Sequence, residues 1–443
     1  MKFEIETSRS RAIADRVRRV MPGGDTRSVT FYPPFPLALV RGDGHRVWDA
    51  DGNEFIDVLN NYTALVHGHA HPEIVRAVQE QAPLGTVFPA PGELQAEVAE
   101  RICDRVDSVE RVRFTNSGSE AVLQAIRIAR AVTGRDHVVK AEGGYHGSWE
   151  QLPMSLHQPH GHVAEEDRSA PVVRGTGIPS AVQDLVHMVR YNDVASLEAA
   201  MAEHGDGVAA LIFEPVLGEG VIPGDPDFFA AARRLADEHG ALLVLDEVVT
   251  ARLAWGGHQS VLGVRPDLTT FGKIIGGGLP VGAVGGREEL MAAFDPRRRG
   301  YVSHSGTFNG NPMTMAAGRV SLDRLTRDEV ARINRLGERL AEGLRQGFRS
   351  AGLEGGVTVY GSFLHLHFES PASIRSFDDV NLASTQLAKM HLACLNERVY
   401  MAPRGMLNLS TAIDDGVVDE LVDRMTRAAA RVVEMGAVSP AVA

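Results

Sequence analysis

A short polar turn follows an apolar stretch in the segment VRFTNSGSEA, which begins at Val112. Ser117 precedes Glu120 by three residues, which is the spacing of a capping box at the first turn of a helix. A strand that enters a helix through Ser-Gly-Ser directs free backbone N–H groups and the positive end of the helix dipole toward one point. The segment therefore predicts either an anion site that suits a phosphate group or an ordinary capped helix.

Two acidic residues, Asp246 and Glu247, end the apolar run LLVLDE. Ligands of open α/β sheets usually bind beyond the carboxyl ends of the strands. A carboxylate at such a strand end can bind a metal, act as a base or pair with a heteroaromatic cation. It can equally cap a helix or join a surface ion pair, and the run alone does not separate these interpretations.

Lys273 lies in TTFGKIIGGGLPVGAVGG, where it is one of few lysines and precedes three consecutive glycines. Glycine lets the backbone approach a ligand closely or adopt a positive φ. A lysine in a dry, crowded pocket has a depressed pKa, which suits Schiff-base chemistry. The glycines do not form a GxGxxG pattern between a strand and its helix, so we do not expect a nicotinamide site.

Short apolar runs alternate with helical runs through the middle of the chain, which positions these three segments. The runs HVVKAE, AALIFEP and ALLVLDE have the composition of buried parallel strands. Helices are predicted over 121–134, ending at Gly134, and over 228–240. This alternation predicts an α/β domain with a mostly parallel sheet covered by helices on both faces.

The pattern changes from about Met315, where a smaller α+β domain is predicted. A long amphipathic helix over 328–352 precedes one alternating strand over 358–368. The first ~60 residues contain a predicted hairpin at Asp51-Gly52 and are expected to join this domain. The predicted organisation is an N-terminal segment, a large domain and a C-terminal small domain, with the limits 1–60, 61–314 and 315–443.

Composition narrows the class of protein. The chain has 443 residues, 44% hydrophobic and 23% charged, and its net charge of −12 argues against a nucleic-acid partner. The arginine-rich start, 8–20, is interpreted as the polar face of a helix. No apolar stretch approaches the ~20 residues of a membrane span, the N-terminus lacks a signal-peptide pattern, and the two cysteines form no CxxC. These features predict a soluble cytoplasmic protein without a membrane partner.

No metal site is expected. His67, His69 and His71 alternate and invite a zinc hypothesis, but no further cluster of ligands is evident in the sequence. A structural role for these histidines is favoured.

Seven segments occur in an order that resembles a known family. They are GHAHP, NSGSEA, GGYHG, FEPV, LDEV, FGKIIGGGLPVGA and GTFNGNP. In this order they resemble the fold-type I pyridoxal-phosphate enzymes, specifically the class III aminotransferases, and the resemblance extends from Met21 to Ala412. It implies an α/β fold with a large domain built on a mostly parallel seven-stranded sheet and a smaller α+β domain.

The resemblance implies pyridoxal 5'-phosphate as cofactor and assigns the catalytic roles. Lys273 is similar to the Schiff-base lysine, which also serves as the acid and base that moves the substrate proton. Asp246 resembles the partner of the pyridine nitrogen, and holding that nitrogen protonated makes the ring an electron sink. Ser117, Gly118 and Ser119 resemble the phosphate cup. The family usually has threonine at position 119, and serine retains the hydroxyl.

Further cofactor residues follow from the same resemblance. Tyr145 would stack on the ring, Val248 would pack on its opposite face, and His146, in the same GGYHG segment, is counted with the cofactor-binding residues. Glu214 would lie near the phenolic oxygen. Thr307 resembles the phosphate ligand that the neighbouring subunit supplies, which implies a homodimer with shared active sites.

The substrate assignment depends on two arginines. FGKIIGGGLPVGA resembles glutamate-1-semialdehyde aminomutases, whereas TRSVTFYPPFPL and MAPRGMLNLS resemble aminotransferases of aromatic β-amino acids. That second resemblance implies that Arg27 binds the substrate carboxylate and Arg404 the carboxylate of the acceptor, since guanidinium pairs with carboxylate through two hydrogen bonds. Phe31 and Tyr32 would supply an apolar wall. Either arginine can instead form a surface ion pair.

The resulting hypothesis is a ping-pong transaminase that moves the amino group of a β-amino acid to 2-oxoglutarate or pyruvate. The donor is expected to be aromatic, such as (S)-β-phenylalanine. An aminomutase, which needs no separate acceptor, is the first alternative. A decarboxylase or racemase that uses the same cofactor residues, and a non-catalytic protein that binds the cofactor, are further alternatives.

Overall fold

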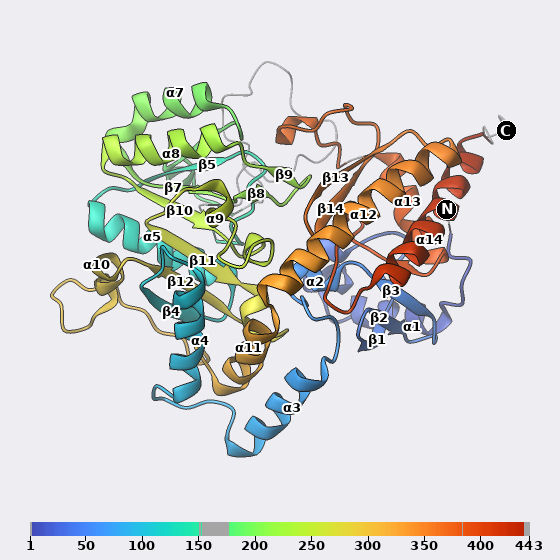
Figure 1. Ribbon diagram of the computed structural model, residues 1–443, viewed down its shortest axis with the longest axis horizontal. Helices are drawn as coiled ribbons and strands as arrows, with labels where there is room; N and C mark the ends of the chain where they lie inside the picture. Colours follow the sequence, from blue (N-terminus) through green and yellow to red (C-terminus); the bar gives the residue numbers. More distant parts are fainter. Residues whose placement is uncertain (1, 150–151, 153–176, 383, 438–443) are drawn as a thin grey trace. The chain divides into compact units, whose positions relative to one another are not determined.

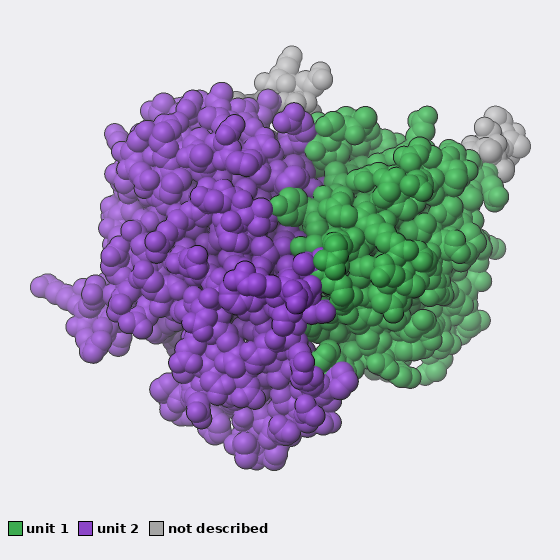
Figure 2. All heavy atoms as spheres, in the orientation of Figure 1, with its two compact units in different colours: residues 1–71, 332–374, 378–443 green, residues 72–331, 375–377 purple. Residues whose placement is uncertain are grey.

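The computed structural model describes residues 2–149, 152, 177–382 and 384–437 (Figure 1). The chain divides into two compact units (Figure 2). Unit 1 comprises Met1–His71, Arg332–Ile374 and Asp378–Ala443, and unit 2 comprises Pro72–Ala331 and Arg375–Phe377. The domain limits 1–60, 61–314 and 315–443 stay a prediction beside this division.

Unit 2 contains a seven-stranded sheet with a mostly parallel arrangement, as predicted. Its strands, in spatial order, are β4 (Arg111–Thr115), β12 (Gly282–Gly286), β11 (Leu268–Gly272), β10 (Leu242–Asp246), β7 (Val208–Phe213), β5 (His137–Ala141) and β6 (Val186–Val189). Only β12 runs antiparallel to its neighbours. All residues of β7 and β10 are buried, which explains their uninterrupted apolar sequences.

Both helices predicted for the middle of the chain are present in unit 2. The helix α5 (Gly118–Thr133) packs against β11 and β12, and α8 (Pro226–His239) packs against β7 and β10. Gly134 ends α5 in the left-handed conformation, with φ 69°, as the sequence predicts. Other elements of the unit are α3 (Pro72–Gln81), α4 (Glu93–Arg105), α6 (Ser180–Gln183), α7 (Val194–His204), β8 (Val216–Leu217), β9 (Ile222–Pro223), α9 (Gln259–Leu262), α10 (Glu288–Met291) and α11 (Pro312–Arg324).

Unit 1 contains a four-stranded sheet that includes the predicted hairpin. Its strands are β1 (Leu39–Asp43), β2 (Arg46–Asp49), β3 (Glu54–Asp57) and β15 (Val399–Tyr400). Strands β2 and β3 pair antiparallel, with Trp48 opposite Glu54, and Gly52 in the turn has φ 87°. The arginine-rich start forms the helix α1 (Ser8–Arg18), as expected.

The second sheet of unit 1 corrects one prediction. The segment 358–368 is not one strand, because β13 (Gly356–Tyr360) and β14 (Phe363–His367) pair antiparallel and are joined by a turn at Gly361. Gly361 has φ 56°, a conformation that reverses the chain and favours glycine. The sheet is completed by β16 (Met406–Asn408). The helices are α2 (Asn60–Thr63), α12 (Arg327–Ala351), α13 (Thr385–Asn396) and α14 (Asp415–Ala437).

The alternating histidines contact protein groups in unit 1. His69 Nε2 lies 2.6 Å from Asp57 Oδ2, and His67 Nδ1 lies 3.0 Å from Thr411 Oγ1. Within the described ranges no group of three His, Cys, Asp or Glu side chains is arranged to hold a metal ion. In the same ranges no helix has the length and apolar character needed to cross a membrane.

Candidate active site

Lys273 lies directly after β11, at the start of the 3₁₀ turn η6 (Lys273–Gly276). Its backbone has φ 50°, an unusual conformation for a residue with a side chain. Burial lowers the pKa of Lys273 to about 8, and Arg252 adds to this effect as a like charge. Glu214 and Asp246 oppose the shift because both carboxylates favour the ammonium form. The structure thus places one lysine and two carboxylates within electrostatic reach of one another.

Close packing of α11 holds the lysine-bearing turn. A Cβ atom added to Gly318 of α11 would lie 2.1 Å from the carbonyl oxygen of Ile275, so only glycine fits there. Ser321 Oγ, one turn further along α11, donates a 2.7 Å hydrogen bond to the carbonyl of Ile274. Gly277, in the glycine run after Lys273, serves the same contact, because a Cβ atom added to it would lie 2.5 Å from the carbonyl oxygen of Ala317 in α11.

Replacing Gly318 by alanine is expected to destabilise the protein by about 1–3 kcal/mol, because the helix and the turn must separate to admit the new methyl group. The displaced turn should also weaken cofactor binding. Urea denaturation and cofactor titration of the variant measure the two effects. Gly356→Ala is the matched control, since the nearest atom to its added Cβ is His367 Cβ at 3.9 Å. Equal stability of the two variants would contradict the proposed contact.

Asp246 ends β10 as a buried carboxylate with three partners. Its Oδ1 accepts hydrogen bonds from Thr270 Oγ1 at 2.9 Å and from the backbone N–H of Val248 at 3.1 Å. Its Oδ2 lies 2.8 Å from His146 Nδ1. Burial lowers the pKa of His146, although Asp246 opposes this shift. A neutral His146 that donates from Nδ1 to the carboxylate satisfies both observations.

Glu214 follows β7 and fixes the backbone beside Tyr145. Its Oε2 accepts a 2.9 Å hydrogen bond from the backbone N–H of Tyr145. The ring of Tyr145 is 49% exposed, so it is available to a ligand. Burial and the charge of Asp246 raise the pKa of Glu214 well above its ordinary value.

The predicted capping box is present at the start of α5. Ser117 Oγ accepts a 3.2 Å hydrogen bond from the N–H of Glu120, and Glu120 Oε2 accepts a 2.9 Å bond from the N–H of Asn116. Ser119 Oγ accepts a 3.2 Å bond from the N–H of Ser148. The N-terminus of this 16-residue helix offers backbone donors and a positive dipole end to an anion.

Val248 lies between the predicted phosphate cup (Ser117, Gly118 and Ser119) and the strand ends that carry Asp246 and Lys273. A Cβ atom added to Gly118 would lie 2.9 Å from the Val248 methyl groups, and one added to Gly272 would lie 3.3 Å from Val248 Cγ1. The start of α5, the segment after β10 and the end of β11 therefore meet at one side chain. Unit 2 brings together nearly all of the predicted cofactor residues: Ser117, Gly118, Ser119, Tyr145, His146, Glu214, Asp246, Val248 and Lys273.

Thr307 lies in an exposed loop before α11. The loop is tied to the end of β4, because Asn116 Nδ2 donates a 2.7 Å hydrogen bond to Asn309 Oδ1. In the described part of the chain, no hydrogen bond joins Thr307 to the other predicted cofactor residues. Its neighbour Phe308 is 57% exposed.

The four predicted substrate residues belong to unit 1. Arg27 is exposed, and its Nη1 donates a 2.7 Å hydrogen bond to Asn61 Oδ1. Phe31 is 52% exposed, whereas Tyr32 is buried, and its hydroxyl accepts a 2.8 Å bond from the N–H of Leu37. Arg404 is half-buried in the turn between β15 and β16, next to Gly405 with φ 96°.

The sequence analysis missed three residues that surround this site. Thr270 donates to Asp246, Arg252 is fully buried near Lys273, and Lys140 is fully buried in β5. Charged residues inside an apolar strand, or within a few residues of its buried end, are rarely fully buried unless they are paired. That signal was visible for Lys140 and Arg252, whereas nothing local distinguishes Thr270.

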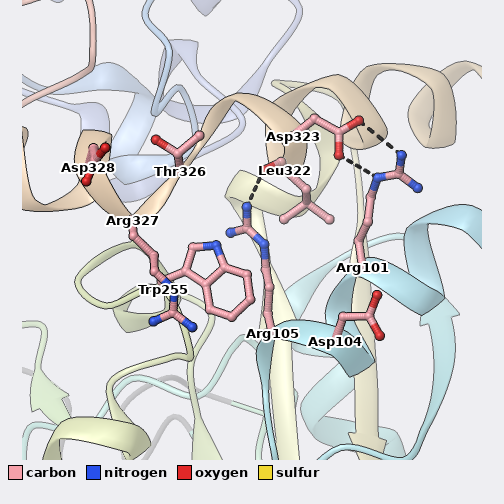
Figure 3. A pocket seen from close by; sticks show the side chains of 9 residues that line it. All are labelled: Arg101, Asp104, Arg105, Trp255, Leu322, Asp323, Thr326, Arg327 and Asp328. Atoms are coloured by element: carbon pink, nitrogen blue, oxygen red, sulfur yellow. Dashed lines mark hydrogen bonds and ion pairs between the residues drawn. The ribbon is translucent and has the colours of Figure 1, made fainter.

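A separate pocket of about 540 Å³ in unit 2 is lined largely by charged residues, several of which contact one another (Figure 3). The guanidinium of Arg327 lies 3.9 Å from the ring centroid of Trp255, and that of Arg105 lies 5.3 Å from it. Arg101 pairs with Asp323 at 2.6 Å. The lining residues are Arg101, Asp104, Arg105, Trp255, Leu322, Asp323, Thr326, Arg327 and Asp328. These contacts join the last turn of α4 to the end of α11, and none of the predicted site residues lines the pocket.

Comparison with known proteins identifies the family. The family model for class III aminotransferases matches residues 29–428. The chain belongs to the class III aminotransferases. It is 42% identical over 412 residues to the beta-phenylalanine transaminase of Variovorax paradoxus, covering 91% of this chain and 88% of that protein. It is 41% identical over 362 residues to the glutamate-1-semialdehyde 2,1-aminomutase of Methanothrix thermoacetophila, covering 81% and 82%.

The fold of this class III aminotransferase is also that of solved relatives. An omega-transaminase from Sphaerobacter thermophilus superposes with a TM-score of 0.91 at 40% identity, covering 97% of this chain and 99% of that one. The expected fold type, aminotransferase class and pyridoxal-phosphate dependence are confirmed. The site fits this cofactor, because it offers a capped helix start to a phosphate, a buried carboxylate to a ring cation and a lysine of lowered pKa to an aldehyde.

Proposed function

We propose that the protein transfers the amino group of an aromatic β-amino acid, such as (S)-β-phenylalanine, to 2-oxoglutarate or pyruvate by a ping-pong reaction. The observation that carries the proposal is the exposed guanidinium of Arg27, held by Asn61, in the same segment as the exposed ring of Phe31. A guanidinium recognises a carboxylate and an aromatic ring recognises an apolar side chain. The 42% identity to a beta-phenylalanine transaminase supports this choice.

Within unit 2, each residue has a proposed part in the reaction. The cofactor, when bound, supplies an electron sink for the charge that develops on the substrate carbon. Lys273 holds the cofactor covalently and then moves the substrate proton, a task suited to an amine whose pKa is lowered to about 8. Asp246 accepts a hydrogen bond from the ring nitrogen and keeps it protonated.

The remaining cofactor residues position the ring and its phosphate. Ser117, Gly118 and Ser119 bind the phosphate at the start of α5. Tyr145 and Val248 would enclose the ring of the bound cofactor, and Glu214 would contribute near its phenolic oxygen. His146 supports Asp246, to which it is hydrogen-bonded. These assignments rest on the family motifs and on the proximity of the residues in unit 2.

Three further assignments complete the proposal. Arg404 would bind the carboxylate of the acceptor. Tyr32, which is buried and follows Phe31 in the sequence, would support the apolar wall. Thr307 would bind the phosphate in the active site of a second subunit. Its exposed loop and the exposed ring of Phe308 support a homodimer with shared active sites.

An aminomutase is the second candidate. Its support is the 41% identity to a glutamate-1-semialdehyde 2,1-aminomutase and the segment FGKIIGGGLPVGA around Lys273. An aminomutase rearranges one bound substrate, so the separate acceptor and the arginine that recognises it are not needed.

The half-reaction separates these two candidates. Purified protein loaded with pyridoxal phosphate is mixed with (S)-β-phenylalanine without an acceptor, and the visible absorbance of the cofactor should be replaced by that of pyridoxamine phosphate. Arg27→Met should raise the KM for the donor about 10–100-fold, because a charge-assisted contact contributes about 1.5–3 kcal/mol. Arg19→Met, at an exposed arginine of the same unit, is the control and should leave the KM unchanged.

An unchanged cofactor spectrum with β-phenylalanine would reject the transaminase proposal. Conversion of glutamate 1-semialdehyde without any added acceptor would establish the aminomutase instead. A normal half-reaction with an unchanged KM in Arg27→Met would retain the activity and reject the role of Arg27.

A further inference from the structure

Lys140 is a fully buried lysine in β5 that no step of the proposed reaction uses. The chain has only four lysines, and Lys140 has an exposed fraction of 0%. Burying an ammonium group costs a desolvation free energy on the order of several kcal/mol, unless hydrogen bonds and opposite charges compensate it. Its contacts therefore show what the charge is used for.

The ammonium group of Lys140 binds two backbone carbonyls. Lys140 Nζ donates hydrogen bonds to the carbonyl oxygens of Gly144 at 2.8 Å and Leu152 at 3.0 Å. Gly144 immediately precedes Tyr145 and His146. The lysine thus holds the backbone at the start of the segment that carries both residues.

That segment contacts both buried carboxylates of the site. The N–H of Tyr145 donates to Glu214 Oε2 at 2.9 Å, and His146 Nδ1 lies 2.8 Å from Asp246 Oδ2. A Cβ atom added to Gly144 would lie 3.0 Å from His146 Nε2, so the anchored glycine and the imidazole are in close contact. A shift of the Gly144 carbonyl would move both hydrogen bonds together.

Lys140 also contributes charge to the same group of residues. Burial lowers the pKa of Lys140 to about 7, and Glu214 opposes the shift because its carboxylate favours the ammonium. The cation of Lys140 in turn helps to lower the pKa of His146. Glu214, Asp246 and Lys273 are the other charged groups that lie within this electrostatic range.

We propose that Lys140 is a positioning residue whose ammonium group anchors the Tyr145–His146 segment and supplies a buried positive charge that balances Glu214 beside the cofactor site. The proposal rests on the proposed cofactor site and is independent of the substrate. The alternative is a purely structural role, in which Lys140 only donates hydrogen bonds to the carbonyls of Gly144 and Leu152. The two differ in whether the charge itself affects the bound cofactor.

Three substitutions separate these roles. Lys140→Met removes the charge and the donors at similar length, Lys140→Gln retains donors without the charge, and Lys140→Arg retains both. Lys2→Met is the matched control at an exposed lysine. Apo-protein is titrated with pyridoxal phosphate to obtain the Kd, and the loaded protein is titrated with base to find the pH at which the cofactor absorbance changes.

In Lys140→Met we expect the Kd for the cofactor to rise at least about tenfold. Two charge-assisted hydrogen bonds to backbone carbonyls are lost, and the Tyr145–His146 segment beside the cofactor site is then no longer anchored. The midpoint of the absorbance change should move to higher pH in Lys140→Met and Lys140→Gln, because removing a nearby cation makes the protonated form easier to hold. Lys140→Arg should restore the midpoint, and Lys2→Met should behave as the unmodified protein.

A midpoint that stays unchanged in both uncharged variants would overturn the proposal, even if the Kd rises. If Lys140→Met does not fold, Lys140→Gln against Lys140→Arg still gives the comparison of charge. Neither readout involves a substrate. A protein that ignores β-phenylalanine but shows these shifts would therefore lose the proposed donor and keep the role of Lys140.

Discussion

Replacing Lys273 by alanine is expected to lower the rate of amino transfer by at least about 10⁴-fold, or about 5.5 kcal/mol in activation free energy. The substitution removes the amine that would hold the cofactor and the base that would move the substrate proton. Single-turnover absorbance measurements with a reactive amino donor give the rate. The variant should still bind the cofactor non-covalently, because the cup at the start of α5 and Asp246 are unchanged.

Borohydride reduction followed by peptide mass spectrometry tests the attachment site directly. The unmodified protein should carry the reduced cofactor on the peptide that contains Lys273, and Lys273→Ala should carry none. Lys2→Ala, at an exposed lysine, is the control and should retain both the label and the rate. Attachment at Lys140 or Lys389, or amino transfer at the normal rate in Lys273→Ala, would refute the assignment.

Replacing Asp246 by asparagine should reduce the rate of the half-reaction about 10²–10³-fold, the range known for the loss of one preorganised electrostatic contact. Asparagine keeps the shape of the side chain and removes the negative charge that would hold the ring nitrogen protonated. Rapid-mixing absorbance measurements at saturating donor give this rate, and cofactor titration shows whether binding is also affected.

Asp193→Asn is the matched control for this change. Asp193 caps α7 by accepting a 2.9 Å hydrogen bond from the N–H of Ser196, and asparagine caps a helix about equally well. The control should retain both the rate and the stability. A half-reaction in Asp246→Asn that is as fast as in the control would show that Asp246 does not act on the ring nitrogen.

Both predictions concern charged side chains of opposite sign, Lys273 and Asp246, that lie near one another in unit 2. Asp246 ends β10 and Lys273 directly follows β11, and these two neighbouring strands pair in parallel. Their proximity therefore follows from a strand order that the βαβ rhythm alone does not specify. The charges of Glu214, Lys140 and Arg252 join them from three other segments of the chain.

The sequence by itself determined the local features of this protein. The capping box from Ser117 to Glu120, the left-handed end of α5 at Gly134 and the hairpin at Gly52 depend on residues a few positions apart. Such contacts join residues that are close in sequence, so their spacing is sufficient to predict them. The buried strands were also predictable, because a strand covered on both faces is apolar throughout.

The motifs in family order supplied the predicted roles of the site residues, which spacing alone left open. The incorrect prediction arose where one sequence pattern fits two backbone conformations. The alternation over 358–368 continues across Gly361, and only the φ of that glycine shows that the segment is a hairpin. Period-two alternation is the same in one long strand and in two short ones.

Only the tertiary structure decided which side chains meet. His146 and Asp246 are 100 residues apart, and Tyr145 and Glu214 are 69 apart. The order in which β10, β7 and β5 lie side by side brings these pairs together. Lys140 of β5 contacts the carbonyl of Gly144, next to Tyr145 and His146, and this contact likewise follows from the packing of these segments. Contacts of this kind depend on the packing of distant segments, and no local spacing encodes them.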